Sequence, residues 1–384
     1  MSDKVFKIQS IEKKGNRVEA SLLHGGETTN IFFESDDPAL VPSRDALVAL
    51  MLYPAMKAGA ELQVAGEVSA RLLGALPNQQ QVYHTWFPDK FQLIPVTQAA
   101  TVERNNPGAN RVGLFFSGGV DGWHTLIKYR DSITDLILVW GLDIPLDMPQ
   151  LFEQTRQNMQ RVADEFGKNL VVVKTDLRSF TDLYVPWKWL FGTGLSAISQ
   201  LLSGGFCRIY ISAGLHYGYL VPDGSHILVD PYWSSESLEL RHDGLEITRL
   251  EKVRELAQYD IALQTLRVCW RNPGEVYNCG WCEKCLRTMV ALQIVGAYER
   301  CTTFRGPIIP KRLSQVRFLD EVFVHYIEEN MEVLKKQPWN KAIYNAERRV
   351  LLRYYFRNFL FKLHELYPEI RIGRGRFVKK MSKM

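Results

Sequence analysis

The stretch from residue 112 to residue 121 constrains the fold of this chain more than any other. Apolar and small residues typical of a buried strand, 112–116, run directly into Ser117-Gly118-Gly119, and a helix is expected over residues 120–129. Backbone N–H groups and the positive end of the helix dipole converge at such a turn, and glycines let an anion approach the main chain. The pattern predicts a phosphate site, most simply for a nucleotide. An ordinary turn between a strand and a helix is the alternative.

This turn resembles the PP-loop of the ATP pyrophosphatases, which cleave ATP between its α and β phosphates and adenylate an acceptor. The matching residues are Ser117-Gly118-Gly119-Val120-Asp121, and Gly122 takes the place of the serine that usually follows. The resemblance implies that residues 117–122 surround the phosphates of ATP, with Mg²⁺ bridging them. Ser117 and Asp121 are the implied catalytic residues of the loop.

Strands and helices alternate after residue 106. Strands are expected over residues 112–116, 136–140, 170–174 and 208–212, and helices over residues 120–129, 149–166 and 187–202. This spacing predicts an α/β domain over residues 106–300, with a parallel sheet of about five strands and helices on both faces. Ligands of such sheets bind outside the carboxyl ends of the strands, where the Ser-Gly-Gly turn lies.

Residues 1–105 are expected to form a separate small α+β module. Strand-like stretches at 17–23 and 28–34 flank Gly25-Gly26, which predicts a hairpin. A helix from Ser43 to residue 58 and a strand over residues 61–68 follow. The module carries no chemical motif, so a scaffold or partner-binding role is favoured over substrate recruitment. Residues 99–107 are polar and are expected to be a linker.

Further candidate site residues follow later in the chain. Gly214, after the fourth predicted strand, would let the backbone approach adenosine, and His216 is either a substrate contact or a structural residue. Thr248-Arg249-Leu250-Glu251 resembles the Thr-Lys-x-Glu of the PP-loop family, a helix start whose cation meets the ATP phosphates. The resemblance implies this catalytic role for Arg249, whose guanidinium can bind phosphate oxygens in a bidentate way. A capped helix with surface charges is the alternative.

Four cysteines form the second informative pattern, Cys269-x9-Cys279-Gly-Trp-Cys282-Glu-Lys-Cys285. Three thiols spaced three residues apart can face one point, and the fourth completes a tetrahedron. Four thiolates without histidine suit a closed structural Zn²⁺ site. An iron–sulfur cluster would use the same ligands, and unligated thiols are the third alternative. Cys207 and Cys301 lie outside the pattern and are expected to be buried small residues.

Together the two motifs resemble the 7-cyano-7-deazaguanine synthase family. That family pairs a PP-loop with Cys-x7–9-Cys-Gly-x-Cys-x-x-Cys, followed by an arginine that Arg287 matches approximately. The resemblance implies ATP-dependent adenylation of a carboxylate or amide, release of pyrophosphate and attack by a nitrogen nucleophile. Gly122, Arg249 and the sequence Trp140-Gly141-Leu142-Asp143, where the family has Tyr-Gly-Gln-Arg, indicate a divergent relative with its own substrate.

The resemblance also implies a small-molecule acceptor, a flat heterocyclic carboxylate. Aromatic residues near the predicted strand ends would stack on it or belong to the core instead; they are Trp140, Tyr184, Trp187, Trp189, Tyr217 and Tyr219. Two other functions use the same motifs. One is a catalytically degenerate protein that senses a nucleotide or binds a partner in a multiprotein system. The other is sulfur transfer to a tRNA, for which the reactive cysteine would be Cys207 or Cys301. A homodimer is also open.

Basic residues concentrate after residue 310, where 17 Lys and Arg stand against 8 Asp and Glu, although the net charge of the chain is only +5. A helical extension over residues 301–384 is predicted, with an aromatic-rich helix over 342–366 and a basic tail. This mixture could bind RNA or DNA, but a helical cap with its aromatics packed inward is favoured. The apolar content is ordinary for a soluble protein, and neither a membrane span nor a signal peptide is found. A cytoplasmic protein without membrane contact is expected.

Overall fold

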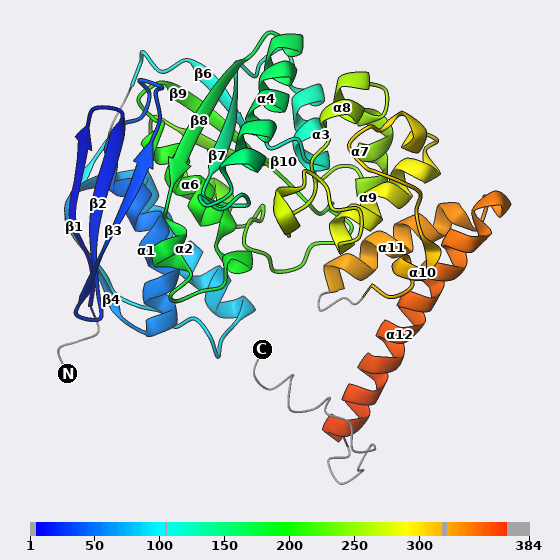
Figure 1. Cartoon of the computed structure of the whole chain (residues 1–384). Helices are drawn as coiled ribbons and strands as arrows, with labels where there is room; N and C mark the ends of the chain where they lie inside the picture. The colour runs from blue at the N-terminus through cyan, green and yellow to red at the C-terminus, as the bar shows by residue number, and fades with distance from the viewer. Residues whose placement is uncertain (1–4, 104–105, 317–320, 367–384) are drawn as a thin grey trace.

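The structure is a computed structural model that describes residues 5–103, 106–316 and 321–366 (Figure 1). The strands are β1 (Val5–Lys14), β2 (Arg17–His24), β3 (Glu27–Glu34), β4 (Glu61–Ser69), β5 (Val96–Val102), β6 (Arg111–Phe115), β7 (Asp135–Trp140), β8 (Asn169–Thr175), β9 (Phe206–Ser212) and β10 (Glu239–Asp243). The helices are α1 (Arg44–Ala58), α2 (Ala70–Trp86), α3 (Val120–Lys128), α4 (Pro149–Phe166), α5 (Arg178–Thr181), α6 (Phe191–Leu201), α7 (Arg249–Leu256), α8 (Asp260–Thr265), α9 (Glu283–Ile294), α10 (Pro310–Leu313), α11 (Glu321–Leu334) and α12 (Lys341–Leu366).

All ten strands belong to one sheet, in the order β10-β9-β6-β7-β8-β3-β2-β1-β4-β5. The predicted sheet of about five strands was therefore wrong in size. Its parallel part, from β10 to β8, contains the four strands that the sequence predicted and adds β10. Because β6 lies between β9 and β7, its carboxyl end is at a switch point of the strand order, where ligands of α/β sheets bind.

Helices cover both faces of the sheet (Figure 1). Ile137 of β7 and Ile209 of β9 pack in one core with α1, α2 and α6. Their neighbours Leu136, Leu138 and Tyr210 pack in a second core with α3, α4, α7, α8 and α9. Successive side chains of a strand point to opposite faces, so the two cores follow from the alternation along each strand.

The N-terminal segment shares this sheet and one of its cores. Strand β3 pairs antiparallel with β8, with Phe33 opposite Thr175 and Glu34 opposite Lys174. Helix α1 is buried from Asp45 to Met56 and packs in the same core as α6, which explains why it is apolar on all sides. The described residues 5–103 thus form no sheet of their own, and β5 occupies part of the stretch expected to be a linker. The predicted hairpin is confirmed as β2 and β3.

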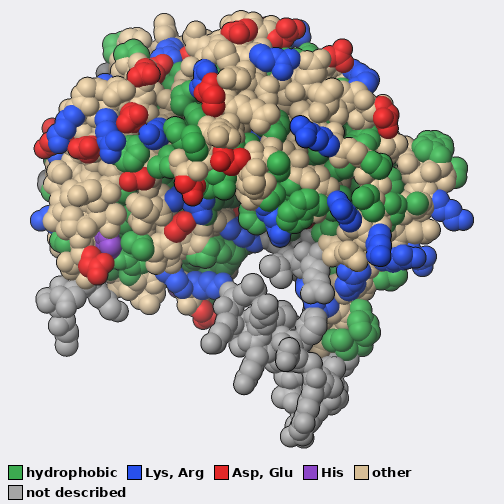
Figure 2. All heavy atoms as spheres, in the orientation of Figure 1, with side chains coloured by type: hydrophobic (Ala, Val, Ile, Leu, Met, Phe, Trp, Pro, Cys, Tyr) green, Lys and Arg blue, Asp and Glu red, His purple; other side chains and the backbone are tan. Residues whose placement is uncertain are grey.

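Helices α10, α11 and α12 lie at the opposite end of the molecule from β1–β3, and α12 extends away from the body (Figure 1). Ala346, Glu347 and Val350 of α12 are buried, whereas Phe356 and Phe359 are 62% and 59% exposed. The expectation that the aromatics of this helix pack inward holds for Tyr354, which packs against the cluster between α11 and α12. It was wrong for Tyr355, Phe356 and Phe359, because the second half of the helix projects past the helices on which the first half packs. Figure 2 shows apolar and basic side chains at the surface where α12 extends. The predicted basic tail lies outside the described residues.

No helix within the described ranges is both long and apolar enough to cross a bilayer.

Candidate anion site and cysteine cluster

The predicted strand, glycine turn and helix are confirmed. Strand β6 ends at Phe115, α3 begins at Val120, and Ser117 is exposed between them. Gly118 has a φ of +78°, and a Cβ there would lie 3.0 Å from the carbonyl oxygen of Thr265. Both the backbone conformation and the space therefore require glycine. The first amides of α3 have no partner within the helix and remain available to an anion.

Gly122 is buried in the first turn of α3. A Cβ at this position would lie 3.1 Å from Cδ2 of Phe116, so even a small side chain would press on that ring. The close packing explains why the serine of the family pattern is not accommodated in this backbone without a shift of Phe116.

Two buried cations of α7 face Asp121 at the start of α3. Nη1 of Arg249 donates to Oδ2 of Asp121 at 2.6 Å, and Nζ of Lys252 lies 3.5 Å from Oδ1. Lys252 also donates to the carbonyl oxygen of Ala213 at 2.7 Å and is only 1% exposed. Burial alone would raise the pKa of Asp121, but Arg249, Lys252 and Arg287 outweigh it and lower this pKa to about 2. Asp121 is therefore a carboxylate at neutral pH.

Arg287 of α9 is the third buried cation of this group. Its Nε lies 3.0 Å from Oε1 of Glu283, and its guanidinium lies 4.1 Å from the centre of the Tyr326 ring. Its Nη1 is buried and has no hydrogen-bond partner in the described part of the chain. Burial lowers the pKa of Arg287. A buried guanidinium with an unpaired N–H is costly, and an anion would relieve that cost.

The sequence identified Arg249 and Arg287 but missed Lys252. The capping box of α7, between Thr248 and Glu251, is present as the pattern indicated, although Arg249 is buried and not a surface charge. Lys252 follows Arg249 by three residues, a spacing that places both on one side of a helix. This spacing was the feature of the sequence from which Lys252 could have been identified.

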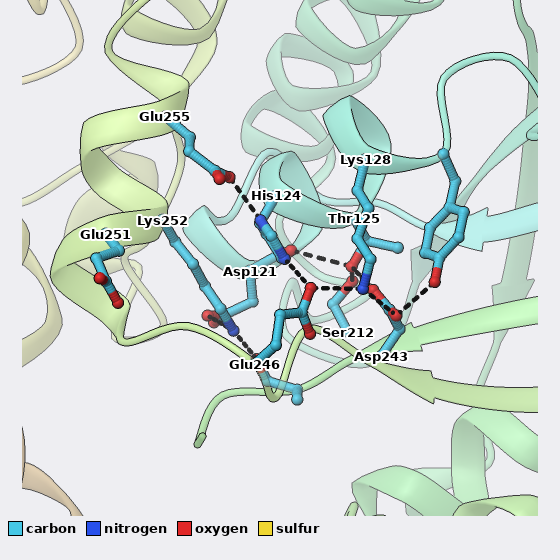
Figure 3. A network of polar contacts seen from close by, with 12 residues as sticks. Asp121, His124, Thr125, Lys128, Ser212, Asp243, Glu246, Glu251, Lys252 and Glu255 are labelled. Atoms are coloured by element: carbon cyan, nitrogen blue, oxygen red, sulfur yellow. Dashed lines mark hydrogen bonds and ion pairs between the residues drawn. The ribbon is translucent and has the colours of Figure 1, made fainter. Parts of the chain in front are cut away.

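A polar network holds α3 against α7 and β10 (Figure 3). Nζ of Lys128 donates to Asp243 at 2.8 Å and to Glu246 at 2.5 Å, and His124 bonds Glu246 and Glu255 at 3.1 and 2.6 Å. Lys128 supplies the cation that Asp243 and Glu246 require, so this cluster needs no metal. The network fixes the helix that carries Asp121 relative to the helix that carries Arg249 and Lys252.

Gly214 follows β9 and is exposed. Its carbonyl oxygen accepts a hydrogen bond from the hydroxyl of Tyr326 at 2.6 Å, so α11 lies beside the position predicted for adenosine. His216, two residues further, contacts His325 of the same helix. No sequence pattern indicated a contact between these segments.

The four predicted cysteine ligands converge on one point, with all sulfur atoms within 4.8 Å of one another. The Sγ atoms of Cys269 and Cys282 are 4.0 Å apart, and those of Cys279 and Cys285 are 3.8 Å apart. Tetrahedral thiolates around zinc at ~2.3 Å would be separated by about 3.8 Å. The cluster can therefore hold a metal ion. Of the two other cysteines, Cys301 is buried as expected, whereas Cys207 is only half-buried.

Residues 265–269 connect the cysteine cluster to the glycine turn. The amide of Arg267 donates to the carbonyl oxygen of Gly118 at 3.0 Å. The side chain of Asn278 accepts from the amides of Val268 and Cys269, and Tyr277 donates to the carbonyl oxygen of Thr265. The loop that carries Cys279 thus positions the segment that packs on the turn.

Most of the six aromatics considered for stacking on a heterocycle have structural partners. Trp140 stacks on Phe152 with ring centres 4.5 Å apart, and Tyr184, Trp187 and Trp189 pack against the core. Tyr217 is 65% exposed. The remaining residue, Tyr219, stacks on a ring of α11.

Comparisons of the chain with models of known protein families, with curated proteins and with solved structures found no match.

Proposed function

We propose that this chain binds the phosphates of ATP at the Ser117-Gly118-Gly119 turn, adenylates a carboxylate or amide and releases pyrophosphate, after which a nitrogen nucleophile displaces AMP. The observation that carries this proposal is a group of three cations, Arg249, Lys252 and Arg287, whose side chains are at most 9% exposed and lie beside a glycine turn at the carboxyl end of β6. Only Asp121 and Glu283 pair with them among the described residues. The remaining positive charge favours a polyanion.

The residues of the turn and of α7 would then have different roles in the reaction. The amides at the start of α3 and the hydroxyl of Ser117 bind phosphate oxygens, and Arg249 and Lys252 stabilise the charge that develops on the leaving pyrophosphate. The carboxylate of Asp121 is a hard oxygen ligand suited to Mg²⁺, which would supply further charge neutralisation between the phosphates. Arg249 would exchange its contact with Asp121 for the phosphates.

The cysteine cluster is proposed to hold a structural Zn²⁺. Four thiolates fill the coordination sphere and leave no position for a substrate or a water molecule. Its role would be to hold residues 265–269 against Gly118, which keeps the phosphate turn in one conformation.

The proposed acceptor is a flat heterocyclic carboxylate. This proposal rests on the resemblance to the deazaguanine enzymes. A thermal-shift screen tests this class, because a ligand that binds only the folded chain raises its melting temperature. Heterocyclic carboxylates should raise it in the presence of a non-hydrolysable ATP analogue. A shift produced instead by amino acids or sugar acids would exclude the heterocycle and retain the adenylation chemistry.

The deciding experiment incubates the full chain with labelled ATP, Mg²⁺ and candidate acids and separates the products. We expect AMP and pyrophosphate that depend on the acid. Lys252→Met should reduce their formation by about 100-fold, as for the loss of one charge-stabilising group. Arg254→Met is the matched control, because Arg254 is an exposed cation of the same helix. Formation of ADP and phosphate alone would disprove the proposal.

A catalytically degenerate nucleotide sensor is the second candidate. The absence of a hydroxyl at Gly122, where a side chain would require a shift of Phe116, favours it. Calorimetry that finds tight ATP binding without turnover on any acceptor would support it. Sulfur transfer to a tRNA has less support, since Cys301 is buried and Cys207 lies at the start of β9, away from the carboxyl ends of the strands.

A further inference from the structure

Three side chains with metal-binding atoms converge where α11 meets the loop after β9. Nε2 of His216 lies 2.8 Å from Nε2 of His325. Oε1 of Glu329 lies 3.4 Å from the first of these nitrogens and 3.2 Å from the second. His325 and Glu329 are four residues apart and therefore face the same side of α11. The group shares no residue with the four cysteines or with the anion site, although Lys252, Arg249 and Arg287 lie close enough to act on its charges.

We propose that His216, His325 and Glu329 bind a divalent first-row metal ion, with Zn²⁺ as the ion they suit best. Two imidazoles and a carboxylate are a common zinc-binding set, and tetrahedral ligands at ~2.0–2.1 Å from zinc lie about 3.3 Å apart. The two separations to Glu329, 3.4 and 3.2 Å, match that spacing, and the 2.8 Å between the two imidazoles is about 0.5 Å shorter. Three protein ligands leave one coordination position open, in contrast to the closed cysteine cluster.

Hydrogen bonds alone do not satisfy these three atoms. The amide of Gly218 donates to Nδ1 of His216 at 3.0 Å, which places the proton of the neutral ring on Nε2. That proton can serve the contact with His325, but Oε1 of Glu329 is buried and has no hydrogen-bond partner among the described residues. A metal ion would accept a lone pair from each of the three groups. The ring proton of His216 then moves to Nδ1, and the exposed amide of Gly218 turns to water.

The surroundings hold the ligands in place. Charges of both signs act on the ligands. Glu251 and Glu328 act on His216 and His325, Lys252 opposes Glu251 at His216, and Arg249 and Arg287 act on Glu329. The ring of Tyr219 stacks on His325 at 3.9 Å with an interplanar angle of 6°, which fixes the orientation of that imidazole. A bound metal would therefore fasten α11 to the end of β9, next to the anion site.

The test is a titration of the metal-stripped full chain with Co²⁺, followed by absorption, with Zn²⁺ content measured by elemental analysis. Thiolate-bound Co²⁺ gives an intense sulfur-to-metal band that a His₂Glu site lacks, so the two sites are counted separately. We expect a second equivalent of metal without the sulfur band. His216→Ala, His325→Ala and Glu329→Gln should each lose that equivalent and keep the thiolate-bound one.

Glu332→Gln is the matched control, because Glu332 is an exposed carboxylate on the same helix. It should retain the second metal. X-ray absorption of the unmodified, zinc-loaded chain gives an independent result that needs no variant. Mixed nitrogen or oxygen and sulfur scattering supports the proposal, whereas sulfur scattering alone overturns it. A second metal that persists in all three ligand variants would also overturn it.

Discussion

Buried ionisable side chains in this molecule are of two kinds. Asp121, whose side chain is 23% exposed, is surrounded by cations, which keep its carboxylate ionised despite partial burial. Glu347 of α12 is fully buried against α11 and has no cationic partner: Nδ2 of Asn330 donates to its Oε1 at 3.3 Å, and its Oε2 has no hydrogen-bond partner among the described residues. The two carboxyl groups therefore respond to pH in opposite ways.

Burial raises the pKa of Glu347 from its ordinary value of 4.5 to about 8. Between these two pH values the folded state holds a proton that the unfolded state has lost. The contribution of Glu347 to the stability of the fold is therefore fully present below pH 4.5 and is lost as the pH rises through about 8. Glu347→Gln should remove this loss. We expect its free energy of unfolding to exceed that of the parent by on the order of 4 kcal/mol at pH 9 and to converge with it below pH 4.5.

Thermal or urea unfolding at a series of pH values measures this difference. Glu332→Gln, an exposed change on α11, should leave the pH profile unaltered. Parallel profiles for the parent and Glu347→Gln would show that Glu347 does not carry the raised pKa.

Among the elements, the start of α9 connects the two motifs of the sequence. Cys282 is the N-cap of this helix and Cys285 lies in its first turn, where the helix dipole favours thiolates. Arg287 of the same helix reaches the anion site. The metal ligands and one of the buried cations are thus parts of one rigid element.

Loss of one cysteine should therefore affect the glycine turn as well as the metal. We expect Cys282→Ser to abolish high-affinity Zn²⁺ binding at this cluster and to unfold residues 269–290, because metal binding is coupled to folding in small thiolate sites. Hydrogen exchange should show lost protection there and at residues 265–268. Cys207→Ser is the control and should retain both metal and protection. A brown chromophore in the purified chain would instead indicate an iron–sulfur cluster.

At the scale of the whole molecule, the ten-stranded sheet joins segments that the sequence had assigned to separate units. The β3–β8 pairing and the packing of α1 with α6 place the N-terminal segment in a common core with the parallel strands. We therefore expect one cooperative unfolding transition for residues 5–300, in which Leu47→Ala and Val162→Ala both lower the same melting temperature. Each should cost about 1–4 kcal/mol. Calorimetry that resolves an early transition affected only by Leu47→Ala would contradict this.

Local chemistry was enough to predict several features from the sequence. The Ser117-Gly118-Gly119 turn, the exact bounds of α4 and the convergence of the four cysteines all depend on residues close together in the chain. Steric freedom at glycine, helix periodicity and ligand spacing act over that range, so they are visible in the residue order.

The pairing of β3 with β8 joins segments that are far apart in the chain, Phe33 opposite Thr175. No periodicity of the sequence indicates which strand edges will meet over such a separation. The burial of Lys252, the meeting of His216 with His325 and the exposure of the α12 aromatics were likewise decided only by tertiary structure. Each of these features depends on whether a second element packs over the residue, which is decided only when the whole chain is folded.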